Sequence, residues 1–288
     1  MSRLCSIHGP SGVIECGAGR PITVIAGPCV LEGHELSMQI GTHVRDLCAR
    51  LGLPYVFKAS FDKANRTSGG SPRGPGLDGI AQLAAIREAL DVPVTTDVHE
   101  PAQAMRVAEV VDVLQIPAFL CRQTDLLVAC AEAAARHGRV VNIKKGQFLS
   151  PQEMRGPVRK VRAAGCDEVM VTERGTFFGY HRLVNDFAGV GDLLEFGESI
   201  DEAAARGPAV CFDCTHSVQL PGAGEVTGGR RNRIPMLARA AAGVGVDAVF
   251  LECHPEPEGA PSDGANMLPL GEVGPVLESV ARIAEIGR

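Results

Sequence analysis

The sequence predicts a (β/α)8 barrel preceded by a short hairpin, and two observations indicate this fold. Short apolar runs alternate with longer amphipathic segments along nearly the whole chain. Strands that are apolar throughout are typical of parallel sheets, because helices or a barrel interior cover both of their faces. The second observation is size: 288 residues with 45% hydrophobic content suit one such barrel. We therefore expect residues 1–288 to form one domain.

The expected elements follow one another in a regular order. Residues 1–20 predict an N-terminal hairpin, in which segments 4–8 and 12–16 are joined by a turn containing glycine and proline. Apolar runs predict strands at residues 22–29, 55–61, 93–99, 111–118, 140–146, 168–175, 209–216 and 248–254. Amphipathic periodicity predicts helices at residues 35–51, 79–90, 101–110, 126–136, 151–164, 235–243 and 270–286. Residues 183–205 show no clear pattern.

Composition limits the kinds of ligand that we expect the chain to bind and the cell compartment in which we expect it. The net charge of -6 argues against nucleic acid or an anionic membrane as the main partner. Cationic residues gathered into one pocket would then serve a small anion. The ten cysteines are dilute and lie mostly within apolar patterns, and we see neither a signal peptide nor a long apolar span. We expect reduced thiols and a cytoplasmic location.

The carboxyl ends of the predicted strands carry most of the polar residues that suggest chemistry. In a (β/α)8 barrel these ends converge at one mouth, where active sites lie. The residues that this rule brings together are Cys29, Lys58, Lys63, Asp97, His99, Gln115, Lys144, Lys145, Glu173, Arg174, Asp213, His216, Glu252 and His254.

One group of these residues is cationic. Segment 58–68 reads KASFDKANRTS and follows an apolar strand. Lysine and arginine bind phosphate oxygens, and amide or hydroxyl groups such as those of Asn65, Thr67 and Ser68 add neutral hydrogen bonds. Taken alone, the segment is equally compatible with a solvated surface loop. Lys58, Lys63, Arg66, Lys144 and Arg174 together could neutralise two phosphates, or a phosphate and a carboxylate.

A second group has the chemistry of a metal site. Cys29, His216 and Glu252 end the first, seventh and eighth predicted strands, which closure of the barrel places side by side, and Asp263 follows in the last loop. One sulfur, one nitrogen and two carboxylates suit Fe(II) or Zn(II), or Mn(II) less well. The spacing leaves open that Cys29 is only a small apolar residue. Cys211 and Cys214 are unsuitable as a pair, because residues three apart on a strand face opposite sides.

Several motifs resemble those of the 3-deoxy-D-manno-octulosonate 8-phosphate (KDO8P) synthases. The similarity covers nearly the whole chain and includes AGPCVLE (26–32), KANRTS (63–68), GPGL (74–77), TDVHE (96–100), QIPAFLCRQTD (115–125), NIKKGQF (142–148), TERG (172–175), FDCTHS (212–217) and HPEP (254–257). The related 3-deoxy-arabino-heptulosonate 7-phosphate (DAHP) synthases carry a shorter Lys-Pro-Arg-Thr-Ser motif in place of KANRTS. Residues 181–186 (HRLVND) differ from the usual family pattern.

The resemblance implies a transferase that condenses phosphoenolpyruvate (PEP) with D-arabinose 5-phosphate and water, a step toward the lipopolysaccharide core. It implies that PEP is held by Lys58, Lys63, Gln115, Lys144 and Arg174. Asn65, Arg66 and Thr67 match the positions that hold the pentose phosphate. Cysteine at position 29 is typical of the metal-dependent members, whereas metal-free members carry asparagine there. The resemblance also implies a homo-oligomer, expected to be a tetramer.

These considerations predict a complete set of site residues. The predicted catalytic residues are Lys58, Lys63, Lys144, Arg174 and His216. The predicted substrate-binding residues are Asn65, Arg66, Thr67, Ser68, Gln115, Asp97 and Asp213. The predicted ligands of a divalent metal ion are Cys29, His216, Glu252 and Asp263. Three alternatives stay open: a DAHP synthase-like reaction with another aldose phosphate, a Schiff-base aldolase that uses Lys144, and a non-catalytic sugar-phosphate-binding barrel.

Overall fold

The computed structural model describes residues 3–64, 72–177, 181–198, 206–221 and 228–286. A parallel sheet closes on itself at the centre, because its last strand pairs with both β9 and β3. Its strands are β3 (Thr23–Gly27), β4 (Tyr55–Lys58), β5 (Val94–Asp97), β6 (Val113–Ile116), β7 (Val140–Lys144), β8 (Val169–Glu173), β9 (Ala209–Asp213) and β12 (Ala248–His254). The predicted (β/α)8 barrel is confirmed.

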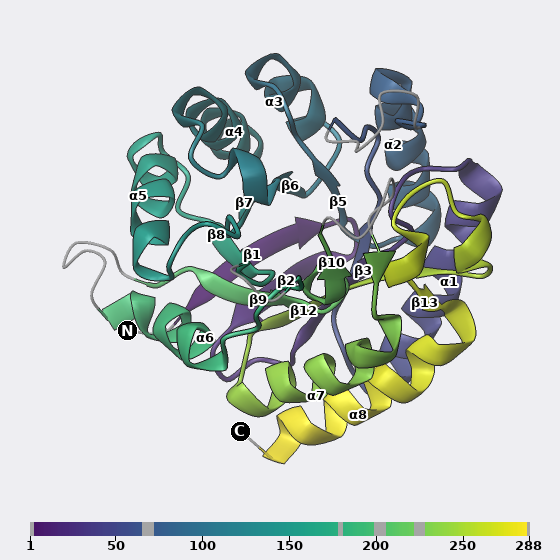
Figure 1. Cartoon of the computed structure of the whole chain (residues 1–288). Helices are drawn as coiled ribbons and strands as arrows, with labels where there is room; N and C mark the ends of the chain where they lie inside the picture. Colours follow the sequence, from purple (N-terminus) through teal and green to yellow (C-terminus); the bar gives the residue numbers. More distant parts are fainter. Residues whose placement is uncertain (1–2, 65–71, 178–180, 199–205, 222–227, 287–288) are drawn as a thin grey trace.

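Helices surround the sheet as a ring (Figure 1). They are α1 (His34–Leu51), α2 (Gly79–Leu90), α3 (Pro101–Ala108), α4 (Thr124–His137), α5 (Arg155–Ala163), α6 (Phe187–Leu194), α7 (Ile234–Val244) and α8 (Val273–Ile286). The predicted helices at 151–164 and 270–286 start too early, because short 3-10 turns, Gln152–Met154 and Leu270–Glu272, precede the α-helical parts. Helix α6 lies where the sequence showed no clear pattern, and the Asp186 side chain caps it.

Most of the predicted strands end too late. Strand β3 ends at Gly27 and β4 at Lys58, so that Cys29 and Lys63 lie in the loops after them. The polar residues leave the sheet and turn over the mouth of the barrel. Short strands complete the loops: β10 (Gln219–Leu220) pairs antiparallel with β11 (Gly228–Gly229), and β13 (Leu268–Pro269) extends the sheet beside β12.

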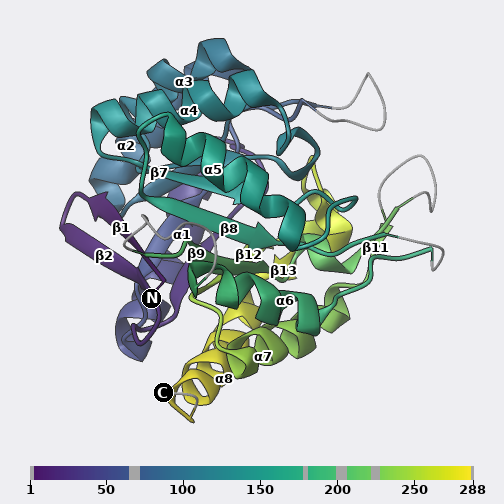
Figure 2. The same cartoon turned by 90° about the vertical axis from the view of Figure 1, so that its left-hand side faces the viewer.

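The predicted N-terminal hairpin is present and closes one end of the barrel. It consists of β1 (Leu4–Gly9) and β2 (Gly12–Gly17). Its buried side chains Cys5, Ile7 and Cys16 pack against interior residues of the barrel strands, including Val113 and Phe250. Figure 2 shows the hairpin at the end of the barrel opposite β11. The mouth formed by the carboxyl ends of the strands is therefore where a substrate can enter.

The cysteines do not form a disulfide framework. All ten are buried and free. Cys211 belongs to the apolar cluster inside the barrel, whereas Cys214 packs with the outer cluster between sheet and helices. This arrangement confirms that the two sulfurs face opposite sides. Within the described residues, no helix is long and apolar enough to cross a membrane.

Gly27 allows a close approach between two strands beside the mouth. A Cβ atom at this position would lie 2.1 Å from the carbonyl oxygen of Lys58. We expect Gly27→Ala to lower the free energy of unfolding by about 1–3 kcal/mol, because two backbones must move apart. Gly156→Ala is the control: its Cβ would meet no atom within 4 Å, so stability should stay equal or rise. Denaturant unfolding of both variants tests this, and equal stabilities would contradict it.

Candidate active site

The mouth of the barrel collects the predicted site residues that the structure describes. Asn65, Arg66, Thr67 and Ser68 lie outside the described residues. The others come from the ends of β3 to β9 and β12 or from the loops that follow them. They form three connected groups: an ion pair beside the predicted metal ligands, a histidine–aspartate–lysine contact, and a chain of buried amides and hydroxyls.

Lys58 links the predicted phosphate site to the predicted metal site. Its Nζ forms an ion pair with Glu252 Oε1 and donates a hydrogen bond to the Cys29 carbonyl oxygen at 2.9 Å. The Lys58 and Glu252 side chains are only 1% and 0% exposed. Since an unpaired charge at this depth would be strongly unfavourable, the pair holds the ends of β4 and β12 in one arrangement.

Asp213 orients His216. Its Oδ1 accepts the His216 backbone N–H at 2.8 Å, and its Oδ2 lies 2.7 Å from both His216 Nδ1 and Lys144 Nζ. Burial alone would raise the pKa of Asp213, but His216 and Lys144 lower it well below its usual range. Because Asp213 occupies Nδ1, His216 presents Nε2 to Glu252 Oε2 at 3.6 Å. That nitrogen is the one available to a ligand or substrate.

A chain of buried hydrogen bonds crosses the strands β5 to β8. Thr172 donates to Asn142 at 2.7 Å, Asn142 to Gln115 at 3.2 Å, and Gln115 to Asp97 at 2.6 Å. Ser60 donates to the second oxygen of Asp97. Each donor in the chain points toward Asp97. Burial alone would raise the pKa of Asp97, but Lys63, Lys58 and Lys144 lower it below its usual range. The chain fixes the amide of Gln115 and keeps Asp97 negative.

Arg174 shares a glutamine with the predicted metal site. Its Nη2 donates to Gln219 Oε1 at 2.6 Å, and Gln219 Nε2 donates to Asp263 Oδ1 at 2.9 Å. Arg174 is 6% exposed, and its Nη1 has no hydrogen-bond partner within the described part of the chain. A buried guanidinium donor without a partner is suited to bind an anion. Sequence reasoning missed Gln219, because it follows a 3-10 turn beyond β9 rather than ending a strand.

The structure brings three of the four predicted metal ligands together. The ligand atoms of Cys29, Glu252 and Asp263 all lie within 4.8 Å of one another. His216 is outside this set but faces Glu252. Among the described residues, Glu252 Oε2 has no hydrogen-bond partner, as expected for an atom that binds an ion. Cys29, Glu252 and Asp263, with His216 beside Glu252, therefore form a possible site for a metal ion.

The charges around these ligands fit the same interpretation. Burial and Glu252 raise the pKa of the Cys29 thiol, which donates to Asp263 Oδ2 at 3.3 Å. Burial would also raise the pKa of Asp263, but His216 and Lys63 lower it. Burial would lower the pKa of Lys63, whereas Cys29 and Glu252 raise it. Lys63 thus stays cationic beside the carboxylates, and a bound ion would displace the Cys29 proton.

Lys145 has a structural role, unlike its neighbour Lys144. Its Nζ donates to the Leu149 carbonyl oxygen at 3.0 Å and to Thr176 Oγ1 at 3.1 Å. These contacts hold the loop after β7. Lys144 instead lies over the Phe250 ring, with Nζ 4.0 Å from the ring centroid.

Comparison with known proteins places this site in a family. The profile of the DAHP synthetase I family matches residues 6–286. The chain belongs to the DAHP synthetase I family. Three similar curated proteins are each named 2-dehydro-3-deoxyphosphooctonate aldolase. The protein of Synechococcus sp. is 49% identical over 271 residues, covering 93% of this chain and 90% of the relative. That of Methylobacterium radiotolerans is 50% identical over 287 residues, covering 97% and 96%.

A third relative has the same name. The protein of Cyanothece sp. is 49% identical over 272 residues, covering 94% of each chain. The resemblance to KDO8P synthases is therefore confirmed along almost the whole length of the barrel. The roles of individual side chains in this member of the DAHP synthetase I family stay predictions.

The buried hydrogen-bond chain gives a test of the site's architecture. Asn142→Leu keeps the size of the side chain but leaves Gln115 Oε1 and the Thr172 hydroxyl without their partner. We expect a loss of about 1–3 kcal/mol in the free energy of unfolding. Thr23→Val is the matched control, because the buried Thr23 hydroxyl has no partner among the described residues. If both variants unfold at the same denaturant concentration, the chain contributes nothing to the fold.

Proposed function

We propose that this chain is an enzyme that condenses PEP with D-arabinose 5-phosphate and water to give KDO8P and inorganic phosphate. The observation that carries the proposal is the contact between buried cations and predicted metal ligands in one barrel mouth, with Lys58 bonded to both Glu252 and the Cys29 backbone. The names of the curated relatives support the same reaction. We further propose a cytoplasmic homo-oligomer, a tetramer by resemblance, that acts in lipopolysaccharide core synthesis.

The proposed binding of PEP depends on Lys58, Lys63, Gln115, Lys144 and Arg174. In the structure, Lys58 is paired with Glu252 and Lys144 with Asp213. A phosphate or carboxylate that enters replaces these carboxylates as the partner of the lysines. Arg174 Nη1 needs no such exchange, because it has no partner in the described residues. The phosphate of the second substrate repels that of PEP. The same cationic residues offset this repulsion and keep the two substrates close together.

In the proposed reaction, C3 of PEP attacks the aldehyde carbon of the pentose while water adds at C2. The bond between C2 and the bridging oxygen then breaks, so that inorganic phosphate leaves with that oxygen. The oxygen of the added water stays on C2 as the keto oxygen of the product. Lys144 and Arg174 stabilise the negative charge that develops on the departing group. Asp213 occupies His216 Nδ1, so Nε2 can serve either as a metal ligand or as a proton acceptor, but not as both at once.

A divalent metal ion completes the proposed site. Cys29, His216, Glu252 and Asp263 would hold it, and it would supply Lewis-acid polarisation of an aldehyde or a water. Its identity is proposed only as Fe(II), Zn(II) or Mn(II). Glu252 could bind the ion through Oε2, which has no hydrogen-bond partner among the described residues, while Oε1 keeps its contact with Lys58.

One assay tests the proposed function. Phosphate release from PEP is measured with arabinose 5-phosphate, with erythrose 4-phosphate, and with no aldose, each with and without a chelator. The proposal predicts rapid release with the pentose phosphate only. Faster release with erythrose 4-phosphate would assign the DAHP reaction instead. No aldose-dependent release in the metal-loaded protein would indicate a non-catalytic barrel, and trapping of a substrate by borohydride would indicate a Schiff base on Lys144.

Position 29 gives a specific test of the metal site. Cys29→Ala removes the thiolate ligand and should cost most of the bound metal and most of the activity. Cys29→Asn should keep activity that a chelator does not abolish, because metal-free relatives carry asparagine there. Metal content by mass spectrometry and activity with chelator are the measurements. If Cys29→Ala retains the metal, or is more active than Cys29→Asn, the thiol only fills space.

Lys144→Ala tests the proposed phosphate site. The loss of a charged hydrogen bond should lower kcat/KM for PEP about 10- to 100-fold, with a smaller effect on the aldose phosphate. Lys160→Ala is the control, because that lysine lies on α5 and its Nζ donates to Thr124 Oγ1 at 2.7 Å in an exposed contact that involves none of the predicted site residues. Steady-state kinetics with each substrate varied in turn give the answer. Unchanged constants for PEP in Lys144→Ala would exclude Lys144 from the site.

A further inference from the structure

A second cavity lies at the rim of the barrel, beside the proposed active site. Its volume is about 580 Å³, which lies in the range of small-molecule sites. It is lined by residues of three segments: the loop before α6, the turn after β9 with β10, and the start of α7. Helices α6 and α7 are neighbours in both views (Figures 1 and 2). None of the predicted substrate-binding residues that the structure describes lines it.

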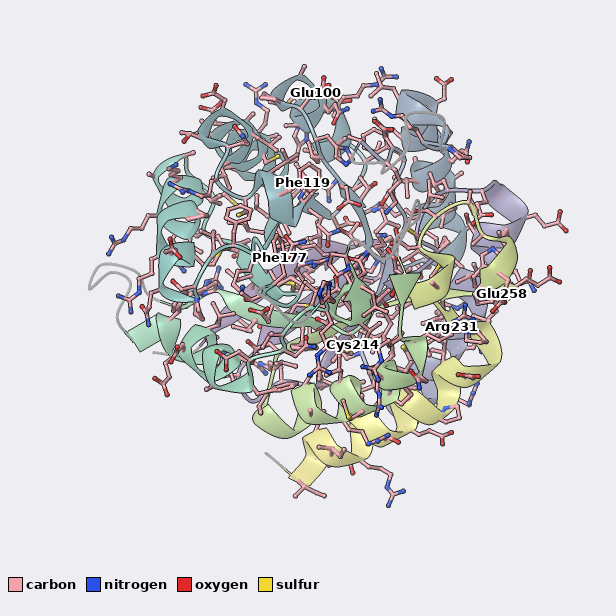
Figure 3. All side chains as sticks on the ribbon, in the orientation of Figure 1. Glu100, Phe119, Phe177, Cys214, Arg231 and Glu258 are labelled. Atoms are coloured by element: carbon pink, nitrogen blue, oxygen red, sulfur yellow. The ribbon has the colours of Figure 1, made fainter. Side chains whose placement is uncertain are left out.

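Positive charge gathers at this cavity in a chain whose net charge is -6. Arg182, Arg230 and Arg233 line it, and no aspartate or glutamate is among its described lining residues. Arg230 and Arg233 have no ion pair or side-chain hydrogen bond in the described part of the chain. Their neighbour Arg231 differs, since it pairs with Glu258 at 2.7 Å, beside it in Figure 3. Two arginines are thus left available for an anion.

One lining residue has a buried hydroxyl. Ser217 lines it and is 2% exposed, yet its Oγ has no hydrogen-bond partner within the described residues. A buried polar atom without a partner is unfavourable unless a ligand satisfies it. Met236 and Leu237, in the first turn of α7, bring the amino end of that helix to the same cavity. The free N–H groups of a helix's first turn favour an anion.

Apart from Asn185 and Gln219, the rest of the described lining is apolar. It includes Val184 and Met236, which are 36% and 47% exposed, and Phe187. Such side chains favour a ligand with an apolar body. We propose that this cavity binds a small phosphate monoester whose phosphate contacts Arg230, Arg233 and Ser217 and whose apolar body contacts Met236 and Phe187.

The cavity shares one wall with the proposed active site. Gln219 lines the cavity and also bonds both Arg174 and Asp263. The two sites are therefore separate but adjacent. Four of the lining residues, Arg182, Leu183, Val184 and Asn185, belong to the segment 181–186 that differs from the KDO8P synthase pattern.

The test uses phenyl phosphate as the probe and isothermal titration calorimetry. We expect wild type to bind it at least about 10-fold more tightly than inorganic phosphate, because of the apolar lining. The variant R230S/R233S should lose at least about 10-fold in affinity for phenyl phosphate. The control R239S/R282S removes the same charge from exposed positions on α7 and α8 and should bind as wild type does.

Ser217→Ala separates binding from folding. Because its hydroxyl has no partner in the described residues, this variant should keep or gain thermal stability while binding phenyl phosphate about 2- to 10-fold more weakly. The probe should also bind in the presence of saturating PEP. Equal affinity in R230S/R233S, R239S/R282S and wild type would overturn the proposal. Complete displacement of the probe by PEP would assign it to the active site and would overturn the proposal as well.

Discussion

The buried ion pair between Lys58 and Glu252 is the interaction on which the arrangement of the mouth depends. It joins β4 to β12 across β3, and Lys58 also holds the Cys29 backbone. Charges at such depth persist only when they are paired, so the site must supply a carboxylate for each buried cation. The ion pair between Lys144 at the end of β7 and Asp213 at the end of β9 follows the same principle. The fold thereby holds buried cations that can bind a phosphate and buried carboxylates that can bind a metal ion.

The barrel supports this exchange by keeping everything around it fixed. The hairpin of β1 and β2 fills the opposite end with apolar side chains, which leaves one open mouth. The buried chain from Thr172 to Asp97 crosses neighbouring strands and allows little freedom to Gln115. Gln219 bonds both Arg174 and Asp263. It therefore fixes the distance between a predicted phosphate-binding residue and a predicted metal ligand. Only the partners of the lysines have to change.

The sequence was sufficient to predict the fold and most of the clustering. Apolar runs predict buried parallel strands, and closure of the barrel then places Cys29 near Glu252 without any further information. What periodicity could not predict are contacts that depend on side-chain direction. The rule of strand ends alone lists both Lys144, which faces the mouth, and Lys145, which holds a loop, although only Lys144 entered the predicted cationic group. Periodicity also missed α6, whose eight residues include two glycines, and Gln219, whose position depends on a 3-10 turn.

The central claim is that Glu252 couples the two halves of the site, because its Oε1 pairs with Lys58 and its Oε2 is available to a metal ion. The most direct test is calorimetric titration of PEP into the metal-free protein and into the protein saturated with a divalent metal ion. A metal ion on Oε2 would draw negative charge away from Oε1 and weaken its hold on Lys58. The ion should therefore tighten PEP binding on the order of 10-fold, and PEP should tighten metal binding by the same factor. Equal PEP affinity in both titrations would show that the Lys58–Glu252 pair does not connect the sites.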